Sequence, residues 1–580
     1  MRTNSKARSK SKIRVADYIA SFLVEKGVKD LFVLTGYGAM YLNDAIAAHP
    51  TLKYYCVRNE ATSPMMAEAY ARIKQVPAAV CLTAGPGSTN AVPGLAEAWV
   101  DSAPIIVISG QVHRDHTTYK ANISGLRTFG TAEINIIPIV KPLTKYAQEV
   151  SNPNLIRYYL EKAFYLATAG RPGPVWLDVP LDIQYAHVDP KSLKGFVPPK
   201  LHKNMRLEGQ IERLIKFLNR SKRPLIVAGQ GIKQAGASRQ FKNLARLINA
   251  PVILTRLGLD LLPYSHPNNM GLGGIKGSRY CVSVMKKADL VICLGARLAI
   301  PFVGSKLDMF DTRAKIVAVD IEKAELEKPG VKIDLPIHDN VLDFLNKLSD
   351  RLSQEKIKKS RQWLQHCQKL KRDNPMVIPQ MRRNPIDLYY FMSRLDEISS
   401  KNNILVTDAG SNYYVGGQVF RFEKGQKEVT SATFAAMGLS IPLAIGAAVA
   451  KPRTKVLAVT GDGSLELNMQ ELKTMSYYNL NIKLFVINNG GYVSIRNWQD
   501  TFFGGRHIGS DDKTGAETLN LKKVAEAFDL NYECINQWEE IDTKLKQITS
   551  VDGPVFVEVV CDNRQRIIEP IKNKGSGSYG

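Results

Sequence analysis

The sequence predicts an α/β fold of three doubly wound domains with mainly parallel sheets. Short runs of apolar and β-branched residues recur along the chain and end at glycine, as in LFVLTG, LIVAG, LVICLG and VLAVTGDG. Segments of helix length separate these runs, which is the pattern of parallel strands joined by crossover helices. At 580 residues the chain has room for about three or four domains of average size. Ligands bind where the strands of such sheets end, so the glycine turns mark the candidate sites.

Two stretches without hydrophobic periodicity divide the chain. The first, around 185–205, is rich in Pro and Lys, and the second ends in RDNPMVIPQMRRNP. Such composition is typical of linkers. We therefore expect six parts, which are a basic disordered arm over 1–14, an N-terminal domain over 15–190, a central domain over 200–350, a basic linker over 351–383, a C-terminal domain over 384–573 and a flexible tail over 574–580.

The composition is that of a soluble globular protein, because 44% of the residues are hydrophobic and 23% are charged. The seven cysteines are scattered and include no Cys-x-x-Cys pair. This pattern argues against a secreted disulfide framework and against a zinc ribbon. We therefore expect reduced cysteines and a cytoplasmic location.

The net charge of +24 raises the question of an anionic partner. The excess sits largely in two places, since residues 1–14 carry six basic side chains and residues 351–383 carry ten against two acidic ones. No ladder of alternating aromatic and basic residues accompanies them. We therefore expect no nucleic-acid partner.

One apolar stretch is long enough to cross a bilayer, because residues 429–450 include 22 positions without a charge. The stretch also contains several hydroxyl residues, Pro442 and many small side chains, which suit packing against protein. We expect a buried loop and helix here, and no membrane span.

The strongest chemical signal is the run TGDGSLELNMQELKTMSYYNLNIKLFVINNGGY. A strand over 456–459 leads to Asp462, and a second strand over 483–487 leads to Asn489, 27 residues further on. One strand–helix–strand crossover fits this spacing, so both side chains should lie at neighbouring strand ends. With the backbone carbonyl of Gly491 they offer hard oxygen ligands that suit Mg²⁺.

The same turn suits an anion. The backbone N–H groups of Gly463 and Ser464, and the start of an amphipathic helix that we expect to follow them, can face a diphosphate. Asp462 as a simple helix cap and Asn489 as a simple turn residue are the alternative interpretation. The ordered pair at crossover spacing favours the diphosphate–Mg²⁺ cradle.

This run resembles the thiamine-diphosphate signature of the acetolactate synthase and pyruvate decarboxylase superfamily, and the resemblance extends over roughly residues 14 to 570. Near the N-terminus, VRNEATSPMMAEAYAR and CLTAGPGSTNAVPGLAEAWVDSAPIIVISGQV are similar to two further family segments. The resemblance implies thiamine diphosphate and Mg²⁺ as cofactors. It assigns the cofactor contacts to Gly410, Ser411, Met437, Gly461, Gly463, Ser464, Gly491 and Tyr492, with Asp462, Asn489 and Gly491 on the metal.

The resemblance gives Glu60 the central catalytic role. A carboxylic group that bonds the pyrimidine ring favours the imino tautomer, which lets the cofactor deprotonate its own thiazolium carbon. Met437 would be the apolar wedge that holds the two cofactor rings bent. Without the resemblance, Glu60 could equally be part of a helix cap and Met437 ordinary core filling.

Several details resemble the acetolactate synthase branch. Gly36, in GYGAM, matches a glycine turn near the reacting carbon, and Gln111, in SGQV, matches a polar pocket residue. Pyruvate decarboxylases carry adjacent histidines near this point, whereas here Arg114 and Asp115 separate His113 from His116. The substrate pocket would also include Tyr37, Gly38 and Trp498.

The central part is similar to the domain of that branch in which FAD often binds. Gly274, Arg297 and Asp320 match contact positions. The acidic and basic residues that usually follow the arginine are replaced by Leu-Ala-Ile-Pro, so the FAD site is incomplete in sequence.

The resemblance implies a carboligase that decarboxylates pyruvate and transfers the two-carbon unit to a carbonyl acceptor, a second 2-oxo acid. Three alternatives stay open at this point, which are a nucleotide-linked ketosugar as acceptor, a non-oxidative decarboxylase that releases an aldehyde, and a non-catalytic cofactor-binding subunit. The family builds its site from two subunits, so we expect a homodimer or homotetramer.

Overall fold

The computed structural model describes residues 12–200, 204–355, 357, 360–399 and 402–571. Residues 1–11 of the expected arm and the expected tail lie outside the described residues. Residues 13 and 14 were also expected in the arm, but they form β1 (Ile13–Arg14), because they pair with β8 (His187–Val188). The chain divides into two compact units, residues 1–201 and 202–580.

The predicted fold class is confirmed, because the chain contains three six-stranded sheets in which every strand pair is parallel. The first sheet has the order β3-β2-β4-β5-β7-β6 and the third has the order β16-β15-β17-β18-β20-β19. When the strands of each sheet are numbered from one in chain order, both sheets have the order 2-1-3-4-6-5, so their topology is the same. The second sheet, β11-β10-β9-β12-β13-β14, has the dinucleotide-fold order instead.

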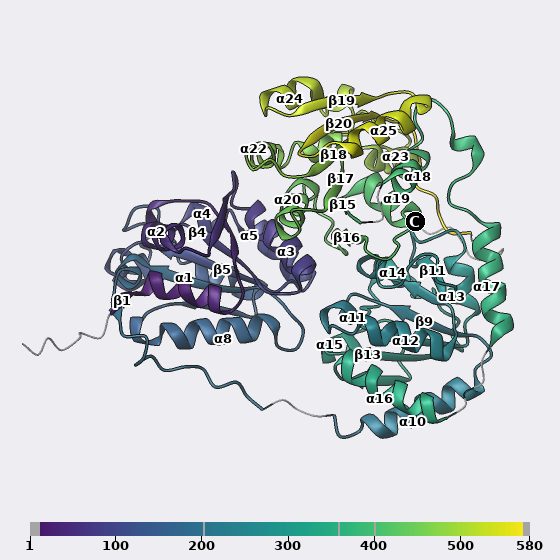
Figure 1. Cartoon of the computed structure of the whole chain (residues 1–580), viewed down its shortest axis with the longest axis horizontal. Coiled ribbons are helices and arrows are strands. Elements are labelled where there is room, and N and C mark those ends of the chain that lie inside the picture. The colour runs from purple at the N-terminus through teal and green to yellow at the C-terminus, as the bar shows by residue number, and fades with distance from the viewer. Residues whose placement is uncertain (1–11, 201–203, 356, 358–359, 400–401, 572–580) are drawn as a thin grey trace, which may run out of the picture. The chain divides into compact units, whose positions relative to one another are not determined.

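The first unit has helices on both faces of its sheet (Figure 1). Its strands are β2 (Asp30–Val33), β3 (Lys53–Cys56), β4 (Ala78–Leu82), β5 (Ile105–Gln111), β6 (Tyr146–Glu149) and β7 (Val175–Pro180). Alternate strand residues such as Leu31 and Val33 pack against α1 (Val15–Glu25), α2 (Met40–Ala48) and α8 (Ile156–Thr168). Phe32 points to the other face, where its ring meets Tyr70 of α3 (Thr62–Lys74) at 6.3 Å.

The second sheet lies between two helix layers. Its strands are β9 (Pro224–Ala228), β10 (Val252–Leu254), β11 (Asn269–Leu272), β12 (Leu290–Leu294), β13 (Lys315–Asp320) and β14 (Leu335–His338). One layer contains α10 (Leu207–Arg220), α12 (Ser238–Ile248) and α16 (Val341–Gln354). The other contains α13 (Cys281–Lys287) and α17 (Arg361–Asp373), and α17 falls within the stretch expected to be a linker. Trp363, Leu364 and Cys367 anchor α17, since all three are buried against the sheet.

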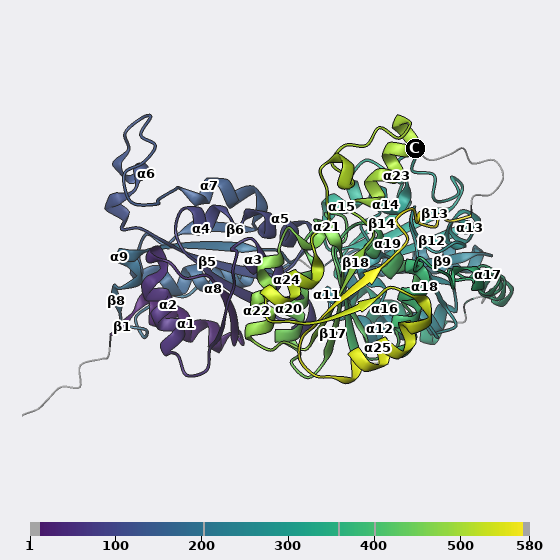
Figure 2. The ribbon, with the colours of Figure 1, turned by 90° about the horizontal axis from the view of Figure 1, so that it is seen from above.

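The third sheet is also sandwiched, with α20 and α22 on one side and α18, α19 and α25 on the other (Figures 1 and 2). Its strands are β15 (Asn403–Thr407), β16 (Lys427–Val429), β17 (Lys455–Gly461), β18 (Ile482–Asn488), β19 (Asn531–Ile535) and β20 (Val555–Val560). Its helices are α18 (Leu388–Ile398), α19 (Gly410–Val419), α20 (Ser440–Ala450), α21 (Asp462–Leu465), α22 (Leu472–Tyr477), α23 (Val493–Phe503), α24 (Leu521–Ala527) and α25 (Ile541–Ser550).

The uncharged stretch over 429–450 ends in α20, as predicted. It begins at the last residue of β16, and the loop between them is not fully buried, since Thr433 and Phe434 are exposed. Every residue of this helix is buried, and it packs on β15, β17 and β18. A helix that is apolar on all sides requires such a complete cover. Among the described helices, none combines the length and the apolar character that a membrane crossing requires.

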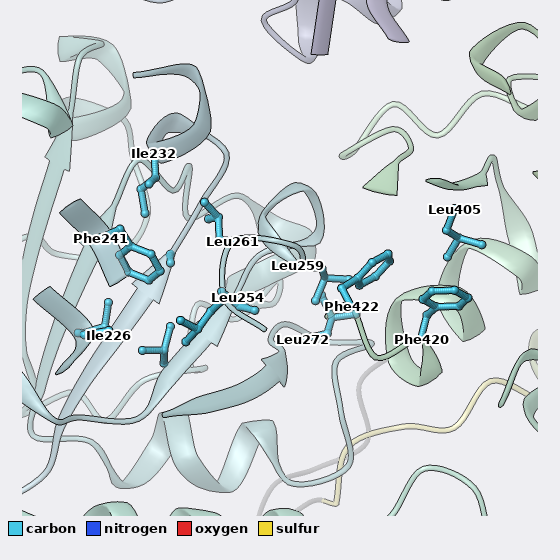
Figure 3. Close-up of a cluster of buried hydrophobic side chains, with 14 of the residues drawn as sticks. Ile226, Ile232, Phe241, Leu254, Leu259, Leu261, Leu272, Leu405, Phe420 and Phe422 are labelled. Carbon is cyan, nitrogen blue, oxygen red and sulfur yellow. The ribbon is translucent and has the colours of Figure 1, made fainter. Parts of the chain in front are cut away.

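The second and third sheets share one continuous core (Figure 3). Leu259 and Leu272 of the central part pack with Phe420 and Phe422, which follow α19. A buried ion pair reinforces this junction, since Arg256 contacts the carboxylate of Glu428.

The Arg256 guanidinium has further partners in the third domain. It donates to the hydroxyl of Thr407 at 3.0 Å and to the carbonyl of Tyr413 at 3.1 Å. It also lies 4.6 Å from the centre of the Tyr413 ring. Burial raises the pKa of the Glu428 carboxyl, and the arginine beside it opposes that shift.

We expect Arg256→Met to destabilise the second unit by about 3–5 kcal/mol, because it leaves Glu428 buried without its cation. Lys347→Met is the matched control, since Lys347 pairs with Glu208 at an exposed site and such pairs contribute about 0–1 kcal/mol. Thermal unfolding of both variants measures the difference. Equal melting temperatures would contradict the role of this ion pair.

Candidate active site

The carboxylate of Glu60 lies just after β3 and is held by one neighbour. Asn90 Nδ2 donates to Glu60 Oε2 at 2.7 Å and also to Asn59 Oδ1 at 2.9 Å. Helix α3 begins after Ala61 without a side-chain cap, and Asn59 is the residue that accepts from the Ala61 N–H. Asn59 and the backbone carbonyl of Glu60, which accepts from Ser63, thus bond the start of the helix, whereas the Glu60 carboxylate bonds to Asn90 instead.

The glycine turn after β2 lies beside this carboxylate, and Thr83 connects the two. Gly38 N donates to Thr83 Oγ1 at 3.1 Å, and a Cβ on Gly36 would lie 2.5 Å from the same oxygen. A Cβ on Gly87 would lie 2.5 Å from Thr83 Cγ2 and 3.4 Å from Glu60 Oε1. Thr83 thus contacts the glycine turn on one side and Gly87, which lies beside Glu60, on the other. A Cβ at Gly36, Gly38 or Gly87 would come too close to these neighbours.

Gln111 is placed differently from the expectation that it contacts substrate. Its side chain is only 1% exposed, and its Nε2 donates to the carbonyl of Ile134 at 2.9 Å and to Asp178 Oδ2 at 3.2 Å. Its Oε1 accepts from the Val112 N–H at 3.0 Å. Burial raises the pKa of Asp178 to about 7. The amide of Gln111 is engaged inside the domain because Asp178 and Ile134 require hydrogen-bond partners there.

The two histidines that the sequence separates approach each other in space. A short 3₁₀ turn over Arg114–His116 follows His113, and it brings the ring centres of His113 and His116 to 5.4 Å. The two rings are thus near each other although the residues are not adjacent in the sequence, and His116 is exposed.

The predicted pair at the end of β17 and β18 is confirmed as a pair of neighbours. Asp462 is 3% exposed, and its carboxylate accepts from the backbone N–H groups of Asn489 and Gly491, both at 3.0 Å. It also accepts from Gly463 N at 2.8 Å. Burial raises the pKa of Asp462, and the backbone N–H groups oppose that shift.

The residues of this turn fit a hard divalent cation. A carboxylate has about four acceptor sites, so three backbone donors leave room on Asp462 for a metal. The side-chain oxygen of Asn489 and the carbonyl of Gly491 are further oxygen donors, and both belong to the turn after β18. Gly491 has a φ of +98°, and a Cβ there would lie 2.8 Å from the carbonyl oxygen of Ser510. Glycine is therefore required at this position.

The helix expected after Ser464 is interrupted, which corrects the prediction. Helix α21 has four residues, and a 3₁₀ turn, Met469–Glu471, separates it from α22. Asn468 causes the break, since it has a φ of −141° and its side chain donates to the carbonyl of Gly438 at 2.9 Å. The ten-residue helix that starts at this edge of the sheet is α19, whose first residues are Gly410 and Ser411.

The loop that carries Met437 is attached to the same turn. Ser464 Oγ accepts from the Gly438 N–H at 2.8 Å and donates to Asp408 Oδ2 at 2.6 Å. A Cβ on Gly463 would lie 2.2 Å from the ring of Tyr492, so this ring covers the turn. The residues assigned to the cofactor in this domain therefore lie on connected segments.

Sequence reasoning missed three residues that organise these sites. Asn90 lies in GPGSTN, within a segment quoted above, and Asp408 lies in TDAGSNYY, but neither segment shows which side chain the residue contacts. Arg496 donates to the carbonyls of Asn489 at 2.8 Å, Gly490 at 2.6 Å and Ser510 at 2.6 Å. The only sequence signal for it is a basic residue seven positions after Asn489.

Comparison with known proteins identifies the family. The chain matches three protein-family models, described as thiamine pyrophosphate enzyme N-terminal TPP binding domain, central domain and C-terminal TPP binding domain, over residues 13–134, 211–348 and 408–559. It is also 32% identical to the probable acetolactate synthase large subunit of Methanocaldococcus jannaschii, covering 94% of this chain and 92% of that protein. The chain belongs to the thiamine pyrophosphate enzymes.

Two further relatives of this thiamine pyrophosphate enzyme are also named as acetolactate synthase large subunits. The acetolactate synthase large subunit of Cyanidium caldarium is 30% identical over 93% of this chain and 92% of that protein. The acetolactate synthase isozyme 1 large subunit of Escherichia coli K12 is 29% identical over 98% of this chain and 97% of that protein. The resemblance seen in the sequence is thereby confirmed, and the cofactor-binding domains carry Glu60 and the Asp462 turn.

Two of the three predicted pocket residues of this thiamine pyrophosphate enzyme are exposed, whereas Gly38 is buried. Tyr37 and Trp498 are each 65% exposed. Trp498 lies on α23, and its ring meets Phe502 edge-on at 5.8 Å. Neither aromatic residue is needed for the core of its own domain, which leaves both free to contact a ligand.

The three residues assigned to FAD follow separate strands of the central domain and do not form an open cradle. Gly274, after β11, is buried, and a Cβ there would lie 2.9 Å from the carbonyl of Pro301 and 3.2 Å from Phe302 Cα. Both belong to α14 (Ile300–Val303), which occupies the place where the sequence departs from the family. The Asp320 carboxylate accepts from the Glu322 N–H at 2.9 Å. The backbone of α14 therefore fills the space beside Gly274, which argues against FAD at this position.

We expect Asp462→Asn to weaken binding of thiamine diphosphate with Mg²⁺ more than about 100-fold, because even outer partners of a metal site change its affinity about 10–100-fold. Titration calorimetry on the full chain measures this. Asp529→Asn is the control, since Asp529 is an exposed carboxylate of the same domain that pairs with Lys473. Unchanged affinity in Asp462→Asn would show that the metal binds elsewhere.

Proposed function

We propose that this thiamine pyrophosphate enzyme decarboxylates pyruvate and transfers the two-carbon acetaldehyde equivalent to a second 2-oxo acid. The observation that carries the proposal is the pairing of Asp462 with the Asn489 turn, in a chain that matches acetolactate synthase large subunits along almost its whole length. A non-catalytic subunit would have no need for this pairing together with an oriented Glu60.

The residues divide the work between two places. When bound, thiamine diphosphate supplies the acidic carbon and the ring that accepts the electrons released by decarboxylation. Glu60 would hold the proton on the pyrimidine nitrogen, and Asn90 would keep the Glu60 carboxylate in place. Asp462, Asn489 and Gly491 would hold Mg²⁺ against the diphosphate. Met437 would support the bent shape of the cofactor.

Mg²⁺ is the metal we propose, on the basis of the oxygen donors at the Asp462 turn. We do not include FAD among the cofactors, because α14 covers the Gly274 position. A cytoplasmic location is part of the proposal, supported by seven free cysteines, five of them buried.

A ketosugar linked to a nucleotide is the alternative acceptor within the same chemistry. Isotope-labelled pyruvate offered together with a second 2-oxo acid and with a nucleotide-linked ketosugar distinguishes them by mass analysis of the products. Label in an acetohydroxy acid supports the proposal. Label only in a branched sugar would show that the acceptor is the ketosugar and not a 2-oxo acid. Unreacted pyruvate with both acceptors would overturn the carboligase assignment.

Decarboxylation with release of an aldehyde is a second candidate function, and one observation favours it. The rings of His113 and His116 lie 5.4 Å apart, and paired histidines can act as acids and bases. The same labelled assay without any second acceptor tests this. Free labelled acetaldehyde as the main product would support the second candidate.

We expect Glu60→Gln to lower pyruvate turnover by about 10²–10⁴-fold while cofactor affinity changes little, because proton transfer is lost but Asp462 and Asn489 remain. Steady-state kinetics and titration calorimetry on the same preparation separate the two effects. Glu25→Gln, at an exposed position of α1, is the control. Equal turnover in Glu60→Gln would refute the assigned role.

We also propose a homodimer or homotetramer in which Glu60 of one subunit serves the Asp462 turn of another. Glu60→Gln and Asp462→Asn are then each inactive, but a mixture that exchanges subunits regains about a quarter of the wild-type activity, since mixed dimers contain one intact site. Activity assays after mixing, with sedimentation to establish the assembly, measure this. A mixture that exchanges subunits and stays inactive would show that each site is built from one chain.

A further inference from the structure

The carboxylate of Asp408 is fully buried at the end of β15, outside the residues assigned to the cofactor. It nevertheless accepts four hydrogen bonds. Oδ1 accepts from its neighbour Ala409 N at 2.7 Å and from Asn412 Nδ2 at 2.9 Å. Oδ2 accepts from Thr460 Oγ1 at 2.7 Å and from Ser464 Oγ at 2.6 Å. All its acceptor sites are used within the protein.

These four bonds connect two of the segments that the cofactor would contact. Ala409 and Asn412 belong to the start of α19, which also carries Gly410 and Ser411. Thr460 and Ser464 flank the metal-binding Asp462 on the next strand of the sheet. Asp408 therefore fixes the position of one turn relative to the other.

Ser464 extends the connection to the third segment. The Ser464 hydroxyl donates its single hydrogen to Asp408 Oδ2. The lone pairs of Ser464 Oγ are then directed to the Gly438 N–H, which donates to this oxygen at 2.8 Å. Asn468 holds the other side of the same residue by donating to the Gly438 carbonyl at 2.9 Å. The loop after Met437 is thus clamped in a direction that Asp408 determines.

Gly438 makes this clamp specific. It has a φ of +79°, and a Cβ would lie 2.8 Å from Asn468 Nδ2. Any other residue would be strained and would also displace Asn468. The sequence assigned the backbone N–H of Ser464 to the cofactor, whereas its hydroxyl donates to Asp408 and acts as a bridge.

We propose that Asp408 is a positioning residue that sets the arrangement of the α19 start, the Asp462 turn and the Met437 loop for binding thiamine diphosphate. The inference rests on the proposed cofactor site. It goes beyond that proposal because it assigns the geometry of three separate segments to one carboxylate whose acceptor sites are all used within the protein.

The test compares Asp408→Asn with Asp387→Asn in the full chain. Asp387 is a matched control, since it is also buried in this domain and accepts from Tyr389 N and Gln565 Nε2, both at 2.8 Å, but it caps α18. We expect Asp408→Asn to weaken binding of thiamine diphosphate with Mg²⁺ by at least about tenfold, and Asp387→Asn to change it less than about twofold. Both variants should lower the melting temperature of the cofactor-free protein.

Ser464→Ala provides a milder second variant in case Asp408→Asn does not fold. It should also weaken cofactor binding by itself, because Gly438 loses its acceptor. The double variant should be no weaker than Asp408→Asn alone, since neighbours that act through one chain of bonds are not additive. Independent, additive losses would overturn the bridge.

Each outcome separates this inference from the proposed function. Wild-type protein that fails to take up thiamine diphosphate with Mg²⁺ in calorimetry contradicts the proposed function itself. Wild-type binding with equal affinity in Asp408→Asn and Asp387→Asn contradicts only the positioning role. Loss of affinity in Asp408→Asn, with coupling to Ser464, supports it.

Discussion

A buried carboxylate held by backbone N–H groups is the contact on which the site depends. Asp462 lies at the end of β17 and accepts from the turn that follows β18, so the two parallel strands and their turns form one rigid corner. The pairing of β17 with β18 aligns the two strand ends. Glycine at position 491 lets the backbone of its turn lie close to Ser510 and bond to Asp462. The carboxylate thus has a fixed direction before any metal arrives, which is the preorganisation that a metal site needs.

The sequence alone was sufficient to predict the features that follow from where the strands end. The glycine-terminated runs predicted three parallel sheets, and the spacing of Asp462 and Asn489 predicted that they are neighbours, because crossover topology leaves few alternatives. The roles of Asn90 and Asp408 could not be predicted, since they depend on which of several nearby polar groups each side chain contacts. The helix break at Asn468 was missed for the same reason, because it follows from a contact with Gly438, 30 residues away in sequence.

The two domains of the second unit are not independent modules, because they share a buried junction. Arg256 and Glu428 form a buried ion pair across the junction, and the surrounding apolar residues belong to one core. The Arg256 guanidinium also bonds Thr407, the residue before Asp408. The central domain therefore supports the end of β15, from which the Asp408 turn departs. In the central domain itself, the end of β11 at Gly274 is covered by α14.

The first and third sheets, although they lie in separate units, have the same strand order. No repeat is visible in the residues, so the likeness survives only in the path of the backbone. Such a pattern is what duplication of an ancestral segment would leave once the two copies had diverged in their loops. The loop after the first strand is a glycine turn in the domain of the first sheet and carries Asp408 in the domain of the third sheet. The shared strand order therefore fixes where each loop lies, and the loop residues determine what chemistry it offers.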